Sequence, residues 1–110
     1  MDPIKQPEMK EAIDRLWAKF LPEMKERVAI LQAAATAFAA NQLSEAQQAA
    51  ANTAAHKLAG VLGTFGLTRG TVLAREVEIL YSQENGSDPA IAAKLGTLAA
   101  ELRTLVENRK

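Results

Sequence analysis

Residues 44–67 read SEAQQAAANTAAHKLAGVLGTFGL, and the signals in this stretch predict how the chain folds. Ser44, with Gln47 three residues later, forms the capping-box pattern that begins a helix. The residues that follow are mostly alanine, leucine and other good helix formers. Gly66 is typical of the position just after a helix ends. We therefore predict a helix that begins at this cap and extends through His56 toward Phe65.

The two sides of this predicted helix differ in the size of their side chains. At about 100° per residue, one side collects apolar residues and is expected to face a core. His56, the only histidine of the chain, lies roughly opposite Leu58, on a side of small residues. A glycine inside a helix costs about 0.5–1 kcal/mol relative to alanine, so glycines on this side need an explanation. The apolar side comprises Ala51, Ala54, Leu58, Val61, Leu62 and Phe65, and the His56 side comprises Ala49, Asn52, Ala59, Gly60 and Gly63.

Two explanations of these glycines are open. Either another helix of the fold packs closely against them, or a partner must reach the imidazole without obstruction. Because the helical wheel places Gly60 and Gly63 away from the apolar side, it favours the second explanation. Histidine changes its protonation near physiological pH, and its neutral ring is a nucleophile. The pattern therefore predicts a docking face centred on His56.

Start and stop signals divide the rest of the chain into further amphipathic helices. Short loops between long helices favour antiparallel neighbours. We predict an all-α fold, an antiparallel up-and-down four-helix bundle with an additional N-terminal helix, over about residues 7–20, packed across it. The signals are Pro22 in the first turn of a second helix, Asn41-Gln42 at its end, Thr68 as a cap, Asn85-Gly86 at an end, and Asp88-Pro89 as a cap followed by a first-turn proline.

The composition is that of one helical domain. The chain has 110 residues, of which 48% are hydrophobic and 5% aromatic, so we expect a single domain over residues 1–110. Thirteen basic residues balance thirteen acidic ones, so the net charge gives no long-range attraction to nucleic acid or to an anionic membrane. There is no cysteine, no apolar signal-peptide core and no long apolar stretch. We expect a cytoplasmic protein that binds neither nucleic acid nor membrane.

Other kinds of active site have no counterpart in the sequence. The phosphate-binding pattern Gly-x-x-x-x-Gly-Lys-Ser/Thr is absent. A lone histidine without cysteine gives no zinc site, and no paired-carboxylate cleft or serine nucleophile can be argued. We therefore expect a carrier with no metal and no ATP site of its own, whose chemistry is completed by a partner.

Residues 55–60, AHKLAG, followed by residues 63–67, GTFGL, resemble the active helix of histidine-containing phosphotransfer (HPt) domains. The Gly-Thr-Phe-Gly run is especially similar to the phosphorylated domain of chemotaxis histidine kinases. This resemblance implies that His56 is a phosphoryl acceptor that reacts through Nε2, and that Gly60 leaves room for the phosphoryl group and the partner. It also implies that Glu78, on the next helix, hydrogen-bonds Nδ1 of the histidine. A carboxylate there fixes the tautomer and leaves the Nε2 lone pair free.

The chain departs from the family pattern at one position. The family usually has a lysine three residues after the histidine, where this chain has Ala59. Lys57 and Arg75 are the candidates to supply positive charge to the phosphoryl oxygens instead. The expected binding residues are therefore Asn52, Lys57, Ala59, Gly60, Gly63 and Arg75.

The resemblance also implies the partners. They are the receiver domain of a response regulator, which brings an aspartate and a bound Mg²⁺, and a histidine kinase or hybrid kinase. The function expected is that of a phosphoryl carrier in a two-component phosphorelay, acting as a monomer without a cofactor of its own. The alternative left open is a non-phosphorylated helical module that docks receiver or kinase domains, which the missing lysine at Ala59 supports. Met1 and the polar residues 107–110 favour a free-standing protein over a module of a larger kinase.

Overall fold

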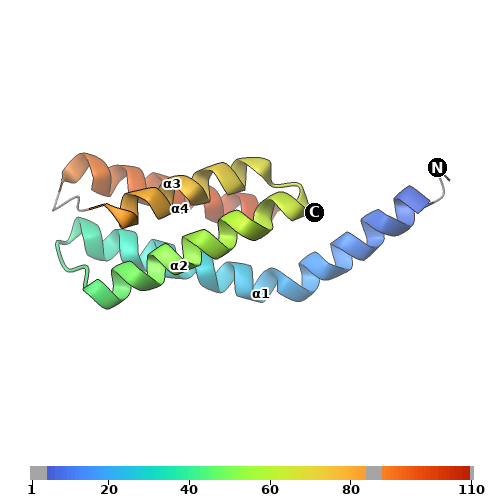
Figure 1. The fold of residues 1–110 in the computed structure, drawn as a ribbon, viewed down its shortest axis with the longest axis horizontal. Helices are drawn as coiled ribbons and strands as arrows, with labels where there is room; N and C mark the ends of the chain where they lie inside the picture. The colour runs from blue at the N-terminus through green and yellow to red at the C-terminus, as the bar shows by residue number, and fades with distance from the viewer. Residues whose placement is uncertain (1–4, 84–87, 110) are drawn as a thin grey trace.

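The computed structural model describes residues 5–83 and 88–109, and within them the chain is a bundle of antiparallel helices (Figure 1). The all-α bundle predicted from the sequence is confirmed. No helix in these two ranges is long and apolar enough to cross a membrane. The elements are α1 (Lys5–Ala39), α2 (Glu45–Leu62), the short 3₁₀ turn η1 (Gly63–Phe65), α3 (Thr68–Ser82) and α4 (Pro89–Asn108).

The break expected before Pro22 does not occur, because α1 runs without interruption through this residue. Residues on both sides of Pro22 belong to one buried stripe, which starts at Trp17 and continues through Met24 and Val28. Proline inside a helix removes one backbone hydrogen bond, but this burial holds the helix together, and Pro22 itself is exposed. The additional N-terminal helix is therefore the first part of α1. Trp17 joins the core, and the start of α1 projects beyond the bundle instead of packing across it (Figure 1).

The ends of α2 follow the predicted pattern. Ser44 accepts a hydrogen bond from the backbone of Gln47 at 3.0 Å, and the Gln47 side chain accepts one from the Ser44 backbone, which completes the capping box. Gly66 adopts φ +82°, and Leu67 N–H donates to the Leu62 carbonyl at 3.0 Å across this turn. The left-handed backbone at Gly66 reverses the chain, so that α3 returns antiparallel to α2.

Two other boundary signals have mixed outcomes. Asp88 accepts a hydrogen bond from Ala90 N–H at 2.8 Å and Pro89 follows it, as predicted for the start of α4. The expected cap at Thr68 is wrong, because Leu67 occupies the cap position and Thr68 already lies in the first turn of α3. The expected end at residues 85–86 lies outside the described residues.

Small residues bring α2 and α3 close together. Ala55 and Ala59 of α2 are buried, as are Gly70 and Ala74 of α3. A Cβ atom at Gly70 would lie 2.8 Å from Cδ1 of Leu62, so a larger residue there would force the buried Leu62 side chain to shift. This close approach places polar side chains of one helix within hydrogen-bond distance of the other.

We predict that Pro22→Ala stabilises the protein by about 1–3 kcal/mol, because alanine supplies the missing N–H within a continuous helix. Urea unfolding followed by circular dichroism measures the change. The matched control is Pro89→Ala, since Pro89 is in the first turn of α4, where no N–H is needed. Equal stability of the Pro22→Ala and Pro89→Ala proteins would contradict the account of α1.

Candidate functional site

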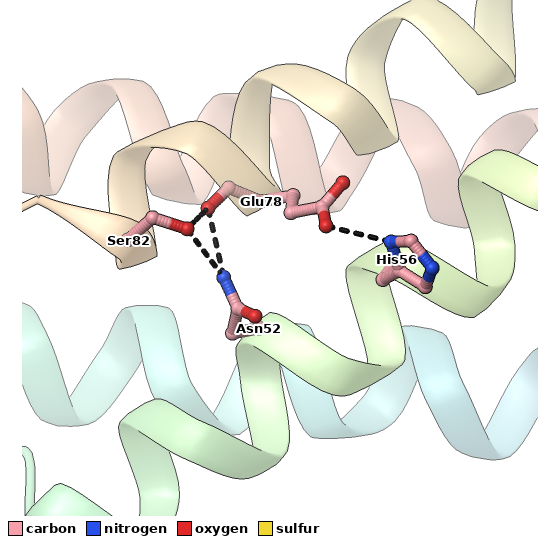
Figure 2. Close-up of polar contacts among 4 residues, drawn as sticks. All are labelled: Asn52, His56, Glu78 and Ser82. Carbon is pink, nitrogen blue, oxygen red and sulfur yellow. Dashed lines mark hydrogen bonds and ion pairs between the residues drawn. The ribbon is translucent and has the colours of Figure 1, made fainter.

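His56 lies on the outer surface of α2, where it faces α3. Its side chain is 74% exposed, while that of Glu78 on α3 is 28% exposed. Nδ1 of His56 lies 2.7 Å from Oε2 of Glu78, and the other ring nitrogen points away from α3 (Figure 2). The structure thus brings together the two residues that the family resemblance implies, with one ring nitrogen engaged and one exposed.

This geometry has a chemical consequence for the imidazole. A carboxylate oxygen can only accept a hydrogen bond, so in the neutral ring Nδ1 carries the proton that is donated to Glu78. Nε2 then holds a lone pair that is directed to solvent. In the neutral ring, the contact with Glu78 therefore orients the imidazole and leaves one ring nitrogen with a free lone pair.

Asn52 is placed on the same side of α2, one turn before His56, but its amide is directed at α3. Nδ2 of Asn52 donates to the backbone carbonyl of Glu78 at 2.9 Å and lies 2.8 Å from Oγ of Ser82 (Figure 2). The Asn52 amide therefore bonds within the protein at the backbone of the residue that holds the imidazole.

The two glycines of the His56 side differ from each other. Gly60 is exposed, and a Cβ atom added there would have nothing within 4 Å. A Cβ atom at Gly63 would lie 3.1 Å from Oγ1 of Thr71 on α3. The open path to the imidazole thus fits Gly60, whereas close helix packing, which the helical wheel disfavoured, accounts for Gly63.

Ala59 is not on an open face, contrary to the helical wheel. It is buried between α2 and α3, and its carbonyl accepts a hydrogen bond from the Thr71 hydroxyl at 3.1 Å. The wheel assumed a single buried side, but α2 packs against α1 on one side and α3 on the other. At the position where the family usually has lysine, this chain has a small residue that lets the two helices approach.

The two candidate cations belong to different helices, Lys57 to α2 and Arg75 to α3. Lys57 is exposed and borders an open groove between α1 and α2, together with Glu23, Glu26 and Arg27 of α1. Arg75 is exposed on α3, one turn before Glu78. Neither cation forms a hydrogen bond or ion pair with another residue in the described part of the chain. Both charges are therefore available to an incoming group.

Sequence reasoning missed three polar residues at the α2–α3 contact, namely Gln48, Thr71 and Ser82. Gln48 Nε2 donates to the carbonyl of Tyr81 at 2.8 Å, in the last turn of α3. The available signal was the four-residue spacing of Gln48, Asn52 and His56, which puts all three on one side of a helix. A helix side that packs only against apolar residues would not carry three polar residues at this spacing.

Two further observations concern the chemistry available in this domain. Tyr81 is buried, and burial raises the pKa of its hydroxyl to about 12 because the phenolate would lose its hydration. It therefore stays neutral at physiological pH. Among the residues that the structure describes, no three His, Cys, Asp or Glu side chains lie together in a way that could hold a metal ion.

We predict that Gly60→Ala stabilises the protein by about 0.5–1 kcal/mol, because alanine is the better helix former and the space is open. Gly96→Ala on α4 is a matched control, since a Cβ atom there also has nothing within 4 Å. Gly63→Ala is expected to gain less or to lose stability, because the new methyl presses on Thr71. Equal gains for all three variants in urea unfolding would contradict the packing role of Gly63.

Comparison with known proteins gives the same family as the sequence resemblance. The family model for the Hpt domain matches residues 15–108. Protein RcaC of Microchaete diplosiphon is 31% identical over 96 residues, a match that covers 87% of this chain and 15% of RcaC. The chain thus corresponds to a small part of that relative's length. No solved structure gives a significant match. From these matches and the paired His56 and Glu78, the chain belongs to the Hpt domain family.

Proposed function

We propose that this domain carries a phosphoryl group on Nε2 of His56 and exchanges it with the aspartate of a receiver domain. Hpt domains are phosphotransfer carriers rather than enzymes, which gives the general role. The observation that supports this assignment is the 2.7 Å contact between Nδ1 and Glu78, with the imidazole otherwise exposed. An exposed and oriented lone pair is what a nitrogen acceptor of a phosphoryl group requires.

The transfer step follows from this geometry. Nε2 attacks the phosphorus of an aspartyl phosphate on the receiver, the N–P bond forms, and the O–P bond breaks as the aspartate carboxylate leaves. No proton has to leave Nε2, so the ring gains positive charge that the Glu78 carboxylate stabilises through Nδ1–H. The reverse step returns the phosphoryl group to an aspartate. Mg²⁺ on the receiver offsets the charge around phosphorus.

Other residues of this face have supporting roles. Gly60 keeps the approach to Nε2 open, because no side chain projects from α2 one turn beyond His56. Lys57 and Arg75 are both exposed, and in this proposal their charges attract the phosphoryl oxygens in place of the family lysine. In this proposal the chain has no ATP site, and a histidine kinase or hybrid kinase supplies the phosphoryl group to the relay.

We predict that the wild-type protein accepts label from a phosphorylated receiver domain and that His56→Gln does not. The variant should fold normally because the side chain is mostly exposed. The measurement follows radioactive phosphate after separation of the proteins, with acid lability as the sign of a phosphohistidine. Label that persists in the His56→Gln protein would place the acceptor elsewhere. No label in the wild-type protein from any receiver would support the non-phosphorylated module.

We predict that Gly60→Gln lowers transfer from the receiver at least about tenfold, because a bulky side chain obstructs docking beside Nε2. Phosphoramidate, a small donor that needs no docking surface, should still phosphorylate His56 in this variant. Gly96→Gln on α4 is the matched control, since it adds the same side chain at another open helix position. Wild-type transfer from the receiver by the Gly60→Gln protein would contradict the docking role of this face.

A further inference from the structure

We propose that Asn52 and Ser82 are positioning residues for His56, which act by holding the backbone of Glu78. Their effect on phosphoryl transfer rests on the proposed function, but their effect on the imidazole itself does not. Figure 2 shows the arrangement, in which Glu78 is contacted at both ends by α2. Its carboxylate pairs with His56, and its carbonyl accepts from Asn52 at 2.9 Å.

The hydrogen bonds at this carbonyl exceed what the helix needs. Glu78 lies inside α3, which ends at Ser82, so its carbonyl lies within the regular hydrogen-bond pattern of the helix. The Ser82 hydroxyl nevertheless donates to it at 2.7 Å, and the Asn52 amide donates both to it and to the Ser82 hydroxyl oxygen. These three bonds form a closed triangle at the backbone of one residue. The Ser82 bond is of the kind that Thr36 and Thr104 also make to the carbonyl four residues earlier, whereas the two Asn52 bonds come from another helix. A carbonyl that already lies within the helical pattern does not need the Asn52 bond.

The three hydrogen bonds hold the backbone of Glu78, from which its side chain extends. Asn52 and His56 are one turn apart on α2, so their side chains lie on the same side, about 5–6 Å apart at Cβ. When Asn52 holds the Glu78 carbonyl, the Glu78 carboxylate lies level with the imidazole along the axis of α2. Glutamate has several rotatable bonds, and a fixed backbone limits the positions that its carboxylate explores. The bond to Nδ1 is thereby favoured.

The alternative is that Asn52 only ties α2 to α3. Gln48 supplies the comparison, because it makes the same kind of bond one turn earlier, from its amide to the carbonyl of Tyr81 at 2.8 Å. Among the described residues, no hydrogen bond joins the Gln48 side chain to Glu78 or Ser82. A purely structural tie would make the Gln48→Ala and Asn52→Ala proteins behave alike at His56.

The experiment uses the fact that the chain has one histidine. A sample labelled with ¹⁵N in histidine gives one set of ring signals, which report the fraction of the neutral ring with the proton on Nδ1. We expect Asn52→Ala to lower the ratio of the Nδ1-protonated to the Nε2-protonated tautomer by about two- to tenfold. This fold-change corresponds to the net contribution of one hydrogen bond. Ser82→Ala should act in the same direction. Gln48→Ala should lower stability to urea but leave the ratio at the wild-type value.

A double-variant cycle separates action through Glu78 from action on His56 directly. Glu78→Ala should lower the ratio at least as far as Asn52→Ala, and adding Asn52→Ala to it should change nothing more. The rate of phosphorylation by phosphoramidate should fall with the fraction of the ring that carries its proton on Nδ1. A wild-type ratio in both Asn52→Ala and Ser82→Ala, or an undiminished effect of Asn52→Ala in the Glu78→Ala background, would overturn the proposal. If the wild-type protein accepts no phosphate, the proposed function fails while the tautomer ratios still decide the roles of Asn52 and Ser82.

Discussion

The close approach of α2 and α3 is the constraint on which the site depends. Alanine and glycine at the contact, including Ala59 and Gly70, bring the two backbones near enough for side chains to bond across the gap. Hydrogen bonds from Gln48 and Asn52 cross this contact to the backbone of α3, and Glu78 meets His56 at the same contact.

The site combines a rigid support with an open face. On the α3 side, Glu78 holds one ring nitrogen and is itself held at its backbone. On the solvent side, the imidazole is exposed and Gly60 removes the nearest obstacle. A carrier needs both properties, because its nucleophile must be oriented before any partner arrives and must then be reached by the partner's own catalytic groups. Such an acceptor requires no enclosed pocket, in agreement with the exposed position of His56.

Much of the fold could be predicted because its signals are local. The capping box at Ser44 and the αL turn at Gly66 depend only on neighbouring residues, and both are confirmed. Pro22 was misread because its cost is local, while the burial that outweighs it is spread along α1 from Trp17 to Phe38. The environments of Ala59 and Gly63 were misread because a helical wheel contains no information about a second packing neighbour. The pairing of Glu78 with His56 came from family resemblance and could not be derived from spacing within one helix.

The central claim is that Glu78 occupies Nδ1 and thereby reserves Nε2 for the phosphoryl group. The most direct test is the site of the N–P bond in the phosphorylated protein, read from coupling between ³¹P and the ¹⁵N-labelled ring of the single histidine. Coupling to Nε2, with Nδ1 still protonated, is the predicted result. Phosphorus on Nδ1 would contradict the account, because the group would then occupy the position where Glu78 contacts the ring.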